Sequence, residues 1–172
     1  MARRKQKTKE FTGTVADIST AFSAIEELKD ELQNWYDNLP ENFQNGDKGS
    51  ALQDSISNLE QDSEPSLPED AENLSITWTE VVGRTSRSTR RDNAVAIVDS
   101  AISEIEQRIS DLEEYTYNED GKRHENGAIL AEGDCLDEGD RDNLKDEYET
   151  LRDELDSAKS NWESAEFPGM YG

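Results

Sequence analysis

The sequence is poor in the residues that build disulfides and metal centres. It has one cysteine, Cys135, and one histidine, His124, in 172 residues. A single cysteine excludes an internal disulfide and a multi-cysteine zinc site. No apolar run approaches the roughly 18 residues of a membrane-spanning helix, and the basic segment 1–9 lacks the apolar stretch of a secretory signal. We therefore expect a protein of the host-cell cytoplasm or of a virion, which is neither secreted nor bound to a membrane.

Large apolar side chains and positive charges are also scarce. Leu, Ile, Val and Phe together number 31, and 41 Asp and Glu outnumber 18 Lys and Arg, for a formal net charge of -23. An apolar share below roughly 20% with high charge is typical of disordered chains and argues against the large core of an enzyme. Because the charge repels phosphates, the acidic body should not bind nucleic acid directly.

No catalytic or ligand-binding pattern stands out. His124 lies in a polar segment without a nearby nucleophile, as expected of a solvated histidine. Cys135 lies among acidic residues that disfavour its thiolate. The acidic segment 134–142 fails the calcium-loop pattern, because Leu136 and Lys145 fall at ligand positions. Phosphate-binding and dinucleotide-binding fingerprints are missing. We therefore predict no enzymatic activity, no cofactor and no metal site.

What the sequence does contain is a heptad repeat in three segments. Its positions are Ile18, Phe22, Ile25, Leu32 and Leu39 in the first segment, Val95, Val98, Ile102, Ile105, Ile109 and Leu112 in the second, and Leu144, Tyr148, Leu151, Leu155, Ala158, Trp162 and Ala165 in the third. A period of 3.5 residues places these side chains on one narrow helical stripe. The pattern predicts long helices near 14–39, 92–116 and 140–166, and a shorter amphipathic helix near 50–60.

These helices lead us to expect an all-α fold, an antiparallel helical bundle or coiled-coil hairpin of three long helices and one short helix, with a long acidic loop. The expected organisation is a basic N-terminal tail (1–13), a single helical domain (14–166) with a linker (61–91) and a loop (117–139), and a C-terminal tail (167–172). Within the linker, Leu74, Ile76 and Trp78 alternate with polar residues, as in a strand. Because a lone strand has no partner, we favour an apolar anchor on the helices.

Acidic side chains on helix faces are the first candidates for partner binding. Like charges four residues apart cost a helix a few tenths of a kcal/mol each, so their number suggests a role beyond folding. The candidates are Glu26, Glu27, Asp30 and Glu31 on the first helix, and Asp146, Glu149, Asp153 and Asp156 on the last. Aromatic and apolar residues near the C-terminus are a second candidate, since such side chains anchor interfaces: Trp162, Phe167, Met170 and Tyr171.

Two basic segments interrupt the acidity. Residues 1–9 carry five positive charges and residues 84–91 carry four. The second segment has no aromatic residue on which a base could stack, and its nearest anions are on the same chain. We therefore expect the Arg side chains of 84–91 to lie across acidic helix faces rather than on nucleic acid.

Residues 14–60 combine a Trp-bearing amphipathic helix, the sequence Asn38-Leu-Pro-Glu-Asn-Phe43, a Gly-Asp-Lys turn and a second helix. This stretch resembles small uncharacterised acidic helical proteins of tailed bacteriophages. The resemblance implies a viral origin and brings no active site with it.

Three interpretations follow. Carboxylates along a rigid helix can imitate the phosphates of DNA, so the chain could act as a DNA-mimic-type inhibitor that binds the basic surface of a nucleic-acid-binding protein. Alternatively, it is a structural coiled-coil component of a phage virion or its assembly, with other virion proteins, or copies of itself joined through the heptad seams, as partners. In the third interpretation the acidity is an adaptation to high salt.

Overall fold

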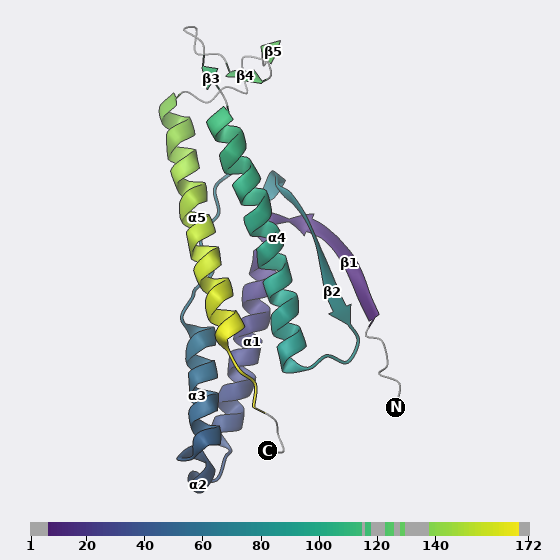
Figure 1. The fold of residues 1–172 in the computed structure, drawn as a ribbon, viewed down its shortest axis with the longest axis vertical. Coiled ribbons are helices and arrows are strands. Elements are labelled where there is room, and N and C mark those ends of the chain that lie inside the picture. The colour runs from purple at the N-terminus through teal and green to yellow at the C-terminus, as the bar shows by residue number, and fades with distance from the viewer. Residues whose placement is uncertain (1–6, 115, 118–122, 126–127, 130–137, 169–172) are drawn as a thin grey trace.

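The computed structural model describes residues 7–114, 116–117, 123–125, 128–129 and 138–168. The helices are α1 (Ile18–Asp37), α2 (Glu41–Gln44), α3 (Asp47–Glu60), α4 (Arg87–Glu114) and α5 (Glu138–Ser164). The strands are β1 (Lys7–Thr14), β2 (Ser75–Val82), β3 (Thr116–Tyr117), β4 (Arg123–Glu125) and β5 (Ala128–Ile129). Short 3-10 turns, η1 (Val15–Asp17) and η2 (Ala71–Asn73), precede α1 and β2. The long helices α4 and α5 lie side by side, and the β1–β2 ribbon flanks α4 (Figure 1).

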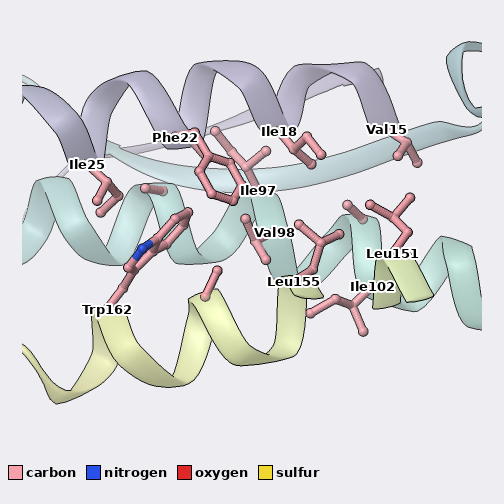
Figure 2. Close-up of a cluster of buried hydrophobic side chains, with 14 of the residues drawn as sticks. Val15, Ile18, Phe22, Ile25, Ile97, Val98, Ile102, Leu151, Leu155 and Trp162 are labelled. Carbon is pink, nitrogen blue, oxygen red and sulfur yellow. The ribbon is translucent and has the colours of Figure 1, made fainter. Parts of the chain in front are cut away.

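The heptad stripes of α1, α4 and α5 meet in one core. The expected burial of Ile102, Ile105, Ile109, Leu151 and Leu155 is confirmed, because each is at most 7% exposed. Figure 2 shows side chains from the three helices pointing toward one another. The apolar period therefore predicted the packed faces of the long helices correctly.

Two aromatic side chains join α1 and α5 within this core. The indole of Trp162 on α5 is fully buried and packs edge-to-face against Phe22 of α1, with ring centroids 4.8 Å apart. Such a pair contributes roughly 0.5–1.5 kcal/mol beyond the apolar area that it buries. Trp162 thus joins the first and last long helices.

The all-α prediction is wrong, because β1 and β2 form an antiparallel sheet. Lys7 lies opposite Val82, and Phe11 lies opposite Trp78, with their rings stacked at 5.9 Å between centroids. The prediction of an apolar anchor around Trp78 is wrong, because this segment has a strand partner in β1, within the residues predicted as a basic tail. Alternation of apolar and polar residues in 74–78 was the correct signal for a strand.

The helix inventory also differs from the predicted three long helices and one short helix. The described residues contain a further short helix, α2, between α1 and α3. Three short strands pair antiparallel in the order β3-β4-β5, partly within the region predicted as an acidic loop. The predicted linker contains β2 and the first residues of α4.

The part of the linker before β2 is fastened across α4 and α5 by two aspartates. Asp62 accepts a hydrogen bond from Nδ2 of Asn161 at 2.8 Å. Asp70 accepts one from the hydroxyl of Tyr148 at 2.6 Å and pairs with Arg108 of α4 at 2.7 Å. These contacts add to the packing of Leu67, Ala71 and Leu74 of this segment on the core.

Candidate functional site

On α5, basic side chains are less exposed to solvent than the acidic side chains with which they pair. Lys145, Arg152 and Lys159 of α5 have side chains only 27–32% exposed, whereas those of the carboxylates that they pair with are 40–70% exposed. Long basic side chains can lay their apolar stems along a helix seam while the charged head reaches water. The cations therefore occupy the inner layer, and the surface that remains is richer in carboxylates than the net charge suggests.

Two of these cations join α4 to α5. Nζ of Lys145 lies 2.8 Å from Oε1 of Glu113 and 3.7 Å from Oε1 of Glu149, and Lys159 pairs with Asp99. The hydrogen bond from Lys145 lowers the pKa of Glu113, and the same bond raises the pKa of Lys145. The bond with Asp99 likewise raises the pKa of Lys159. Both pairs are thus held in their charged forms.

Exposed carboxylates line the outer face of α5, and one of them, Asp153, also pairs with Arg152. Asp146, Asp153 and Asp156, predicted as partner-binding residues, are exposed, as are Glu147 and Glu154 beside them. We call these five residues the α5 carboxylate surface. Glu149, also predicted, is more shielded because it lies near Lys145.

A cleft opens where this surface meets the linker. It has a volume of about 380 Å³, and its walls include Leu67 and Pro68 from the linker and Asp146, Glu147 and Glu154 from α5. Apolar walls next to carboxylates suit the stem and head of a lysine or arginine side chain. Glu147 and Glu154 were not predicted as site residues. The sequence analysis selected acidic residues on the basis of like charges four residues apart, and this criterion favoured their neighbours.

Arginine side chains of α4 pair with part of the acidic face of α1. Glu31 accepts hydrogen bonds from Nε of Arg87 at 3.3 Å and from Nη1 of Arg90, and Nη2 of Arg90 lies 3.4 Å from Oε2 of Glu27. The bond from Arg90 is the main cause that holds the pKa of Glu31 below its ordinary value, against burial, which raises it. The expected placement of the Arg cluster on an acidic helix face is confirmed for Arg87 and Arg90.

The other two predicted residues on α1 flank a lysine. Nζ of Lys29 lies 3.7 Å from Oε1 of Glu26 and 3.9 Å from Oδ1 of Asp30. The four acids of α1 are therefore close to three cations. On the α5 carboxylate surface only Asp153 forms an ion pair among the described residues, with Arg152. This difference makes α5 the stronger candidate for contact with a basic partner.

The end of α5 is held by residues of α4 and α3. No basic residue occupies its last turn, but Nη1 of Arg91 donates to the carbonyl oxygen of Ala165 at 2.8 Å. Ser55 donates to the carbonyl oxygen of Glu166, and Nδ2 of Asn58 donates to that of Ser164 at 3.3 Å. These donors satisfy carbonyl groups that a helix end leaves without partners.

The aromatic candidates fall in different environments. Trp162 is fully buried against Phe22 and offers no surface to a partner. Phe167 is half-buried, with the guanidinium of Arg91 over its ring at 5.6 Å. Met170 and Tyr171 lie outside the described residues.

In the described part of the chain, no group of three or more His, Cys, Asp and Glu residues could hold a metal ion. No helix there is long and apolar enough to cross a membrane. Cys135 and the side chain of His124 lie outside the described portion.

Comparisons with protein-family models, with curated proteins and with solved structures found no match.

Proposed function

We propose that this chain is a non-enzymatic interaction protein whose α5 carboxylate surface binds a basic, nucleic-acid-binding surface of another protein, as a DNA-mimic-type inhibitor does. The observation that carries the proposal is that the basic side chains of α5 are shielded from solvent while its carboxylates are exposed. Cations fasten α5 to its neighbours from the inner layer, while the carboxylates Asp146, Asp153 and Asp156 project from a helix that the core holds rigid.

Rigidity matters because a partner then meets carboxylates that need little ordering on binding. A dense field of one sign raises the rate of capture of an oppositely charged target, and complementary charge suppresses wrong partners. The cleft beside Leu67 and Pro68 adds a place where one basic side chain of the partner can bury its stem.

A matched pair of variants tests the proposal. The test variant is Asp146→Asn, Asp153→Asn, Glu154→Gln and Asp156→Asn. The control variant is Glu26→Gln, Asp30→Asn, Asp47→Asn and Asp54→Asn, which removes the same charge from exposed positions elsewhere. Each protein is immobilised and exposed to the DNA-binding proteins of a bacterial extract, and bound proteins are eluted with duplex DNA.

The expected result is that the unmodified chain and the control variant retain a basic protein that duplex DNA releases, and that the test variant does not. Circular dichroism should show equal helix content in all three. Equal capture by a folded test variant, or a bound protein that duplex DNA cannot release, would contradict the proposal.

A further inference from the structure

The β1–β2 ribbon has one occupied edge and one open edge. On the β2 side, the side chain of Asn93 in α4 makes two hydrogen bonds of 3.0 Å with the N–H and C=O of Val81. Ser100 of α4 donates to the carbonyl oxygen of Thr77 at 2.9 Å. On the other side, β1 has no second strand neighbour among the described residues, and Figure 1 shows it as the outermost element on that flank of the molecule.

The register identifies the open backbone groups. Because the N–H and C=O of Val81 point to Asn93, they point away from β1. Residues opposite each other in an antiparallel pair either exchange both bonds or neither, in alternation. Val81 lies opposite Thr8, so the backbone groups of Thr8 point outward, and by alternation those of Glu10 and Thr12 do as well.

The series of outward-pointing backbone groups on β1 ends at Thr14. Its N–H donates to Oδ2 of Asp17 at 2.7 Å, which closes that end of the edge. The residues before it, Thr8, Glu10 and Thr12, are all exposed. The open part of β1 is thus a template of unpaired donors and acceptors that an extended chain can match.

Positive charge gathers at the end of the ribbon where β1 begins and β2 ends. Lys7 and Lys9 on β1 and Arg84, which follows the positive-φ Gly83 at the end of β2, are exposed. All other Lys and Arg side chains that the structure describes are at least partly buried. Within the described residues, Lys7 and Arg84 form no ion pair, and Nζ of Lys9 lies 4.6 Å from the ring centroid of Phe11.

We propose that the open edge of β1 binds an extended acidic segment of another protein as a third strand of the sheet. Main-chain hydrogen bonds to Thr8, Glu10 and Thr12 would supply affinity, as in other cases of strand addition, and Lys7 and Lys9 select for acidic cross-strand neighbours. Antiparallel pairing of Thr8, Glu10 and Thr12 with the same residues of a second copy is disfavoured, because Glu10 would lie opposite Glu10. This surface is distinct from the α5 carboxylate surface and does not depend on the function proposed for it.

Nucleic acid is the less suitable partner for this edge. Glu10 follows Lys9 directly on β1, and Glu80 lies opposite Lys9 on β2, so phosphates along the ribbon would meet carboxylates at close range. A peptide strand can place its acidic side chains on the lysine-bearing face alone, since side chains alternate between the two faces.

A tethered probe tests the proposal. A strand of alternating Glu and Val is fused ahead of Met1 through a flexible Gly/Ser linker, which gives an effective concentration on the order of millimolar. The readout is amide hydrogen exchange, measured by NMR. We expect exchange at Thr8, Glu10 and Thr12 to slow about tenfold or more in the fusion, because hydrogen-bonded amides exchange only on local opening. A fusion with Lys in place of Glu should leave the three amides unchanged.

The cations are tested with a second pair of variants of the acidic fusion. The test triple is Lys7→Gln, Lys9→Gln and Arg84→Gln. The matched triple, which makes the same change in net charge at exposed positions away from the ribbon, is Asn42→Asp, Gln61→Glu and Asn143→Asp. Protection should be lost in the first and kept in the second.

Four outcomes would overturn the proposal. Unprotected amides in the acidic fusion would exclude strand addition at this edge, and equal protection by the Lys fusion would exclude selection by charge. Concentration-dependent protection in the unfused chain would assign the edge to a second copy. Shifts at Lys7, Lys9 and Arg84 on addition of a short DNA duplex would assign it to nucleic acid.

Discussion

The hydroxyl of Tyr148 donates a hydrogen bond of 2.6 Å to Oδ1 of Asp70, and this bond ties α5 to the linker that precedes β2. The second oxygen of the same carboxylate pairs with Arg108 of α4 at 2.7 Å. Tyr148 is fully buried. One aspartate in a segment without an apolar pattern thus connects both long helices of the hairpin.

Loss of the Asp70 carboxylate should destabilise the fold more than loss of the Tyr148 hydroxyl. Tyr148→Phe removes one hydrogen bond and leaves Asp70 its pair with Arg108, so we expect a cost of about 1 kcal/mol. Asp70→Ala leaves a buried hydroxyl without its acceptor, at roughly 1–3 kcal/mol. Urea denaturation measures both values, with Glu69→Ala, at an exposed neighbouring position, as the control. Equal stability of Asp70→Ala and the parent would show that the linker does not depend on this contact.

Stability should fall at alkaline pH because of Tyr148. Burial, and next the hydrogen bond to Asp70, raise the pKa of Tyr148 above its ordinary value. The unfolded chain loses this proton near pH 10, as model tyrosines do, whereas the folded chain keeps it. The contribution of Tyr148 is therefore fully present below about pH 10 and decreases as pH rises further. Denaturation between pH 8 and about pH 11 should show a smaller decrease in Tyr148→Phe, and parallel curves for the two proteins would refute this assignment.

Truncation of Ile105 should be among the most damaging changes in the core. Its side chain is fully buried on the seam of α4, and removal of a large aliphatic side chain from a packed core costs about 2–5 kcal/mol. Gln107→Ala, on the exposed face of the same helix, is the control. Thermal denaturation measures both. An unchanged melting temperature for Ile105→Ala would mean that the three stripes do not form one core.

Added salt should raise the melting temperature. Cations of the inner layer already pair with carboxylates at short range, but the α5 carboxylate surface has few such neighbours and repels itself. Salt screens this repulsion, with a Debye length of about 10 Å at 0.1 M and roughly 3 Å at 1 M. Calorimetry from low salt to about 0.5 M measures the effect, with the Asp146→Asn, Asp153→Asn, Glu154→Gln and Asp156→Asn variant as the comparison, which should respond less. A flat response would indicate that the outer carboxylates do not limit stability.

Periodicity alone determined the long helices and the sides on which they pack. The positions of Ile102, Ile105 and Leu155 followed from a 3.5-residue repeat, because local geometry places such residues on one stripe whatever the rest of the chain does. The expectation that arginines of 84–91 neutralise a nearby acidic face was also correct for Arg87 and Arg90, since the excess of carboxylates left few other outcomes.

Tertiary structure alone decided the sheet, the linker and the charged surface. Trp78 pairs with Phe11, from which it is separated along the chain by α1, α2 and α3. A strand's partner is chosen by global packing rather than by local propensity. Asp70 meets Tyr148 and Arg108 only after α4 and α5 have paired. The choice between the acidic faces of α1 and α5 depended likewise on where Arg87 and Arg90 come to lie, because a charge is neutralised by its neighbours in space, and the sequence lists only its neighbours along the chain.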